Sequence, residues 1–121
     1  MPFLGDAQER FQASWLSQMA AAVTVLDPQG HILFYNDYAP SLLDRKPSYL
    51  GRPVQELHNA SSAAKIDAIL AAYRQGRYQV HGWSVHRPDQ AFAVQVAPWL
   101  EDGQLQGLIH VAVGLPAAPA V

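Results

Sequence analysis

The sequence predicts an α+β domain: one five-stranded antiparallel sheet with helices on one face, preceded by an N-terminal amphipathic helix. Five runs of β-forming residues are separated by turn residues, and a long segment with helical spacing follows the second run. At 121 residues, 50% of them apolar, the chain has the size of one ordinary domain. We expect this domain over residues 21–115, between a helix over 1–20 and a Pro/Ala tail over 116–121.

The first predicted element is the amphipathic helix. Phe11, Trp15 and Met19 recur every four positions and would form one apolar stripe. The predicted sheet is apolar on both faces, and leaving its large apolar side chains in water would cost about 1.5–3 kcal/mol each. We therefore expect a homodimer in which the N-terminal helix contributes to a two-fold interface.

A β-hairpin follows the helix. Residues 23–26 and 31–36 are rich in β-forming residues, and Asp27, Pro28, Gln29 and Gly30 lie between them. Proline in the second position and glycine in the fourth fit a type I turn.

A long helix is predicted over residues 60–75. Ile66, Ile69, Leu70 and Tyr73 follow one another at helical spacing, and Gly76 supplies the C-terminal stop. Turn residues then separate three strand-like runs, over 78–85, 91–100 and 104–113.

Composition argues against several classes of function. The chain has no cysteine, which excludes disulfides, thiolate metal sites, cysteine nucleophiles and cysteinyl adducts of a flavin. A net charge of −2 without a long basic run predicts no nucleic-acid binding. We find no signal peptide and no apolar stretch near the ~20 residues of a membrane span, and expect a cytoplasmic protein without a membrane partner. Motifs of hydrolases, kinases and dehydrogenases are also missing from the sequence.

Three short motifs, in this order, resemble those of the PAS domain family. Residues 25–36 resemble its opening hairpin, which ends in an asparagine, here Asn36; residues 51–54 resemble a "G-x-x-V" segment before its long helix, and 103–107 resemble its last hairpin. The resemblance covers roughly residues 22–114. It implies a PAS fold and a signalling input module that binds a small ligand or cofactor, or that dimerises.

His58 is the candidate metal ligand, because it stands just ahead of the long predicted helix. The positive end of a helix disfavours a protonated imidazole, and neutral imidazole is a common ligand of transition metals. The segment "L-H-x-x-x-S" here is also similar to a motif of haem-containing PAS domains in carbon monoxide-sensing transcription regulators. That resemblance implies b-type haem held by His58, with a diatomic gas or the iron redox state as the signal. The alternative is that His58 caps or packs against the helix end.

The remaining predicted site residues surround this position. Ser61 and Ser62 could bind a cofactor carboxylate at the helix N-terminus, and Arg45, Lys46 and Arg52 could pair with propionates. His110 is the best candidate for a second ligand. The small residues Ala91, Ala93 and Ala97 alternate with bulky ones and are expected to face the ligand. The predicted cofactor-binding set is His58, Ser61, Ser62, Arg52, Ile66, Ile69, Phe92, Ala93 and His110.

Two other functions stay open. The first is a cofactor-free PAS domain that dimerises or binds a small molecule, with non-covalent flavin as a less favoured cofactor. The second is a small haem enzyme, for which His110 would be the distal acid or base. The spectrum of the purified protein distinguishes haem from both flavin and an empty domain.

Overall fold

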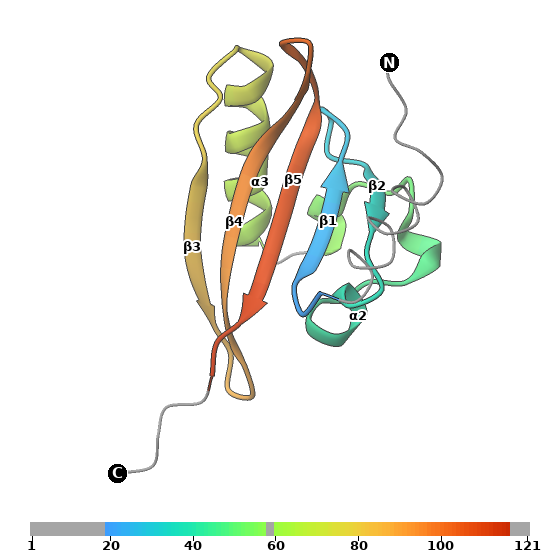
Figure 1. Cartoon of the computed structure of the whole chain (residues 1–121), viewed down its shortest axis with the longest axis vertical. Coiled ribbons are helices and arrows are strands. Elements are labelled where there is room, and N and C mark those ends of the chain that lie inside the picture. Colours follow the sequence, from blue (N-terminus) through green and yellow to red (C-terminus); the bar gives the residue numbers. More distant parts are fainter. Residues whose placement is uncertain (1–18, 58–59, 117–121) are drawn as a thin grey trace.

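The computed structural model describes residues 19–57 and 60–116. Almost all of the helix predicted over 1–20 lies outside this part of the chain, as do His58, Asn59 and most of the tail. The described residues form a five-stranded antiparallel sheet with helices on one face, as the sequence predicts (Figure 1). No helix in these two ranges has the length and apolar character of a membrane span.

The sheet has the spatial order β2-β1-β5-β4-β3, and every neighbouring pair is antiparallel. The first and last strands in sequence therefore lie side by side at its centre, where Leu26 pairs with Leu108. The strands are β1 (Ala22–Leu26), β2 (Ile32–Tyr35), β3 (His81–His86), β4 (Ala91–Glu101) and β5 (Gln104–Gly114).

Strand β3 begins three residues later than the predicted run over 78–85. The register pairs His81 with Val96, so its continuation would place Gln79 opposite Pro98. Proline has no N–H to donate to a neighbouring strand. The carbonyl of Gln79 instead accepts a hydrogen bond from the Tyr73 hydroxyl at 2.6 Å, which ties this segment to the long helix.

The predicted hairpin turn is confirmed. The Gly30 N–H donates to the Asp27 carbonyl at 3.0 Å, and the Asp27 carboxylate accepts from the backbone N–H groups of Gln29 and His31. Asn36, directly after β2, is buried and bridges back to β1: its Oδ1 accepts from the Val23 N–H at 3.0 Å. The asparagine of the opening motif thus holds the chain against β1 at the point where β2 ends.

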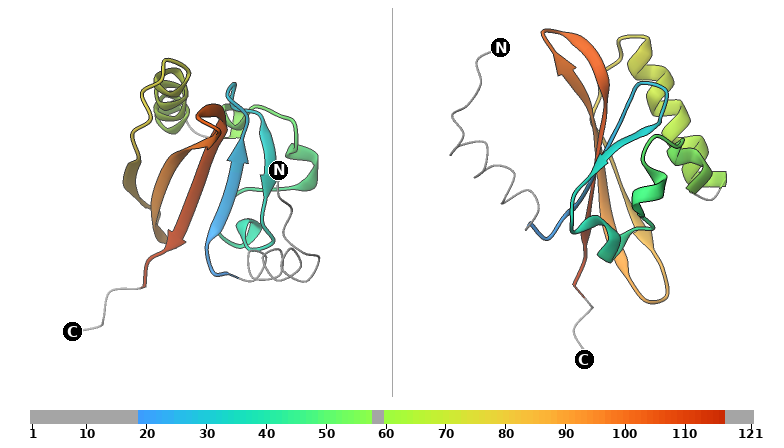
Figure 2. Two further views of the ribbon diagram at one scale, coloured as in Figure 1. Left: turned by 45° about the horizontal axis from the view of Figure 1, so that its top comes forward. Right: turned by 90° about the vertical axis from the view of Figure 1, so that its right-hand side faces the viewer.

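The long helix α3 (Ala60–Arg74) agrees with the prediction to within one residue. Gly76, at φ +84°, follows it, and the Arg77 N–H closes the end on the Ala72 carbonyl at 2.9 Å. Figure 2 shows α3 and the shorter helices on the same side of the sheet. The shorter helices are α2 (Ala39–Leu42) and two 3-10 helices, η1 (Pro47–Tyr49) and η2 (Val54–Leu57).

The hydrophobic core lies between α3 and the face of the sheet that it covers, which we call the inner face. Ile66, Leu70 and Tyr73 are the α3 residues buried most deeply in this core. The inner-face residues packed in it include Ala22, Leu26, Ile32, Val94, Val96, Leu108 and Ala112. Helical and strand periodicity in the sequence therefore describe two surfaces that meet.

Candidate functional site

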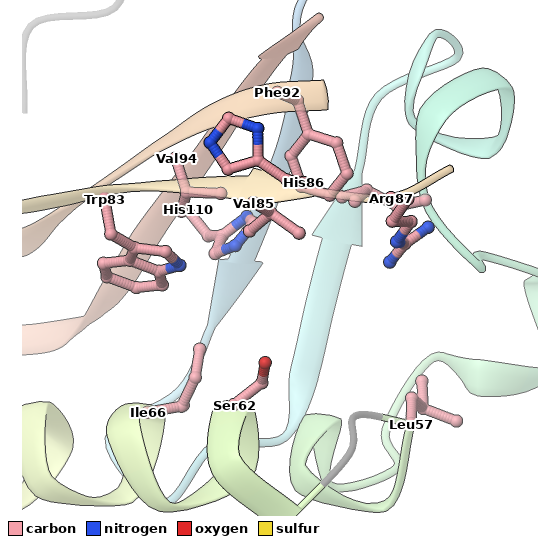
Figure 3. A pocket seen from close by; sticks show the side chains of 11 residues that line it. Leu57, Ser62, Ile66, Trp83, Val85, His86, Arg87, Phe92, Val94 and His110 are labelled. Atoms are coloured by element: carbon pink, nitrogen blue, oxygen red, sulfur yellow. The ribbon is translucent and has the colours of Figure 1, made fainter. Parts of the chain in front are cut away.

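A cavity of about 210 Å³ lies between α3 and the inner face of the sheet (Figure 3). Ser62 and Ile66 of α3 point up into it, and side chains of β3, β4 and β5 form the opposite wall. The described residues that line it are Leu43, Leu57, Ser62, Ile66, Trp83, Val85, His86, Arg87, Phe92, Val94 and His110.

Strand alternation decides which side chains of β4 reach the cavity. Phe92 and Val94 are buried on the inner face and line it. The prediction that Ala91, Ala93 and Ala97 meet the ligand is wrong, because these residues alternate with the buried ones and lie on the outer face. Burying large apolar side chains stabilises the core, so the bulky β4 residues Phe92, Val94 and Val96 face α3.

Four residues of the predicted site come together in the cavity. They belong to the long helix and to two strands that lie side by side in the sheet, so the fold, and not sequence proximity, assembles them. They are Ser62 and Ile66 on α3, Phe92 on β4 and His110 on β5.

Three other predicted residues lie away from the cavity lining. Ile69 is buried in the core, and Ser61 is exposed on α3. Arg52 is on the surface: its Nη2 donates to Glu56 Oε2 at 3.0 Å, and its guanidinium lies 5.4 Å from the Tyr49 ring centroid. Arg52 therefore already has a carboxylate partner, which leaves no argument for a propionate there.

His58 lies outside the described residues, so its binding to haem iron stays a prediction. Within 19–57 and 60–116, no group of three or more His, Asp or Glu side chains is placed to hold a metal ion. The cavity of about 210 Å³ is also smaller than the ~300–1,000 Å³ of sites for drug-sized molecules, and haem is a large ligand on that scale. The described residues fit a ligand smaller than haem.

His110 connects the cavity to a row of buried polar groups. It is 4% exposed and lines the cavity from β5. The register places it beside Thr24 of β1 and Val96 of β4, so the three side chains share the inner face. Thr24 is itself fully buried, and its hydroxyl accepts a hydrogen bond from Arg45 Nε at 3.1 Å.

Arg45 is a buried cation behind this row, with 6% of its surface exposed. Besides its bond to Thr24, its Nη1 donates to the backbone carbonyl of Asp44 at 2.9 Å. Among the described residues, its Nη2 is buried without a hydrogen-bond partner. Burial lowers the pKa of Arg45 from its ordinary value, and the charges of Asp44 and Tyr35 oppose that shift. Arg45 was expected from the sequence to pair with a propionate, but the structure buries it against β1.

Two cations stack on aromatic walls of the cavity. The Lys65 ammonium lies 4.7 Å from the Trp83 ring centroid, and the Arg87 guanidinium lies 5.1 Å from that of Phe92. Val85 and Arg87 were not predicted from the sequence as site residues. Alternation with Trp83 along β3 was an available signal for Val85, whereas Arg87 follows the strand in a turn and carried none.

Comparison with protein families gives a match over nearly the whole chain: the model described as "PAS domain" matches residues 13–115. No curated protein sequence matches. Several solved structures are similar in fold. The PAS domain of Bordetella pertussis BvgS has a TM-score of 0.69 at 16% identity, with 93% of this chain and 89% of that chain covered. A PAS domain from Colwellia psychrerythraea has a TM-score of 0.68 at 18% identity, with coverage of 89% and 97%.

VqmA of Vibrio cholerae, a LuxR-type receptor, is also similar. Its structure described as "bound to DPO" has a TM-score of 0.69 at 22% identity, and the match covers 88% of this chain and 57% of VqmA. At these identities the structural matches show a shared fold.

Proposed function

Since the chain belongs to the PAS domain family, we propose that it is a ligand-binding sensor module whose ligand is a small, ring-sized molecule held in the cavity between α3 and the sheet. The signal would be the occupancy of this cavity, passed on through the packing of the domain. The observation that carries the proposal is the cavity itself, in its size and in the chemistry of its wall.

The cavity volume limits the ligand. At about 30 Å³ per water molecule, 210 Å³ is the space of about seven waters, which suits a molecule with a single ring. Phe92 and Trp83 offer aromatic surface to such a ring, and Ser62 and His110 are polar residues of the same wall. An apolar wall with a few polar groups is the usual composition of a small-molecule site.

The similar structures support a small ligand. VqmA, which shares the fold, is described in complex with DPO and in complex with ligand and DNA. A sensor histidine kinase from Vibrio cholerae shares the fold as well, with a TM-score of 0.63 at 19% identity. We therefore propose that this chain works as the input module of a signalling system, with its output delivered elsewhere.

Isothermal titration calorimetry with three one-ring probes tests the proposal. Benzoate, benzamide and benzylamine have similar sizes and differ in charge, and we expect at least one to bind with saturable heat. Val94→Phe places a bulkier side chain in the cavity and should abolish that binding. Ala93→Phe introduces the same side chain on the outer face and should leave probe binding unchanged. No heat from any probe, or equal effects of the two variants, would contradict the proposal.

Haem binding through His58 remains a separate prediction. An absorption spectrum of the protein as purified and after haem addition tests it, because bound haem gives a Soret band and an empty domain does not. His58→Ala should remove most of the bound haem if His58 is the ligand. If no Soret band appears at either stage, b-type haem is excluded and the small-ligand proposal is unaffected.

We also propose that the outer face of the sheet is covered by a second copy of the chain. Leu33 and Phe34 are 49% and 45% exposed there, and together with Val25, Trp99 and Ile109 they line an apolar hollow. Such a surface is costly to leave in water and is a common site of association. The apolar stripe predicted in the N-terminal segment would contribute to the same interface.

A further inference from the structure

The wall of the cavity is one-sided in charge. Arg87 is the arginine among its described lining residues, and none of these residues is an aspartate or a glutamate. Lys65 adds a further cation where it stacks on Trp83 at the wall. A concave site lined by one sign of charge attracts ligands of the opposite sign.

Arg87 is placed to meet an acidic group. Figure 3 shows its side chain descending from the strand wall at the end of the cavity near Leu57. Its guanidinium lies over the Phe92 ring, which holds the plane of the group against an apolar surface. The two ion pairs of the described residues join His31 to Asp27 and Arg52 to Glu56, so neither uses Arg87.

Arg45 is a second and independent indication. Its guanidinium is buried, and its described hydrogen bonds go to a hydroxyl and a backbone carbonyl rather than to a carboxylate. The Asp44 charge offsets part of the cost, but that carboxylate accepts from the Tyr49 hydroxyl at 3.3 and 3.4 Å. A buried cation without a paired anion is costly. Arg45 is bonded to Thr24, whose partner across the strands, His110, lines the cavity, so an anion in the cavity would lower this cost.

We infer that the ligand is a small ring acid, with its carboxylate bound by Arg87 and its ring packed against Phe92 and Val94. This inference rests on the proposed function and adds the chemical class of the ligand. Arginine suits the role because its planar fork donates two parallel hydrogen bonds to a carboxylate. The buried charge of Arg45 favours the same ligand through its field rather than through contact.

The test compares benzoate with its neutral isostere benzamide by calorimetry on the full chain. We expect benzoate to bind about tenfold more tightly, because a charged hydrogen bond contributes more than a neutral one. Arg87→Gln should bring the two affinities to within about twofold by weakening benzoate alone. Arg77→Gln changes an exposed arginine outside the cavity lining and should leave the preference intact. Arg87 lies on the surface, so both variants should fold normally, which circular dichroism checks.

The outcomes separate this inference from the proposed function. Equal binding of benzoate and benzamide, or an unchanged preference in Arg87→Gln, overturns the inference and leaves the sensor cavity standing. Binding of benzamide or benzylamine without benzoate does the same. If no probe binds at all, the proposed function fails and the inference fails with it. Loss of the preference in Arg87→Gln and its partial recovery in Arg87→Lys would support Arg87 as the acid-binding group.

Discussion

Gly107→Ala should be among the most destabilising single substitutions in the sheet. Gly107 lies in β5 beside an irregularity in the pairing with β4, between Trp99 and Leu100. A Cβ built at Gly107 would lie 1.8 Å from the carbonyl oxygen of Leu26, whereas Cβ atoms essentially never come within 3.0 Å of such an atom. The next closest atoms are also backbone, at Leu26 and Asp27, so no side chain can rotate away.

The geometry gives the size of the effect. One strand must move by about 1.2 Å, the difference between those two distances. The movement falls where β1 and β5 pair Leu26 with Leu108, both buried in the core. Forced backbone shifts in a packed core cost about 1–3 kcal/mol or more, and we expect about 3 kcal/mol or more here. That is a large share of the ~5–15 kcal/mol by which domains are stable.

Urea denaturation followed by circular dichroism measures the change. Gly103→Ala is the control, because Gly103 sits in the β4–β5 turn at φ +74° with nothing within 4 Å of an added Cβ. It should lose about 1 kcal/mol from backbone conformation alone. A Gly107→Ala variant that is within 1 kcal/mol of the unsubstituted chain, or no less stable than Gly103→Ala, would refute the close approach of β1 and β5.

Three further outcomes are expected. Asn36→Ala should lower the free energy of unfolding by about 2–4 kcal/mol in urea, because two buried side-chain hydrogen bonds to backbone groups, at 3.0 and 2.8 Å, are lost; a loss below 0.5 kcal/mol would contradict this. The pKa of Asp27 is below 3.8 in the folded state: burial raises it, but hydrogen bonds from His31 and Gln29 and the charge of His31 lower it by more. The carboxylate therefore stabilises the fold above about pH 3.8, and this contribution is lost as the pH falls further. Asp27→Asn should reduce the loss of stability on acidification, and an unchanged pH profile would argue against the interaction. Light scattering should find the full chain dimeric at micromolar concentration and a chain beginning at Ala20 less associated. A monomeric full chain would contradict the proposed dimer.

Sequence patterns predicted the sheet well because alternating buried and exposed positions mark a strand within its own sequence. The runs predicted over 91–100 and 104–113 agree with β4 and β5 to within one residue. The start of β3 was predicted too early: continued pairing would set Gln79 opposite Pro98, a residue of another strand that has no N–H to donate. A local pattern carries no information about which residue lies opposite.

The site was predicted in part for the same reason. Helical spacing placed Ile66 on the buried face, but alternation along β4 defines two faces without saying which is inside, and Ala93 was assigned to the wrong one. The burial of Arg45 depends on Thr24, which comes from a strand 21 residues earlier. Contacts between distant segments of this kind require the fold. Assigning Arg87 to the site also required the fold, because in the sequence a charged residue in a turn resembles any solvated surface residue.

A methyl-detected NMR titration tests the sensor cavity most directly. The chain is labelled at the methyl groups of isoleucine and valine and titrated with benzoate, benzamide and benzylamine in turn. We predict that for at least one probe the methyl signals of Ile66, Val85 and Val94 shift together along one saturable curve. Val25 and Ile109, on the outer face, should stay in place. Shifts confined to Val25 and Ile109, or no shift with any probe, would contradict a ligand site between α3 and the sheet.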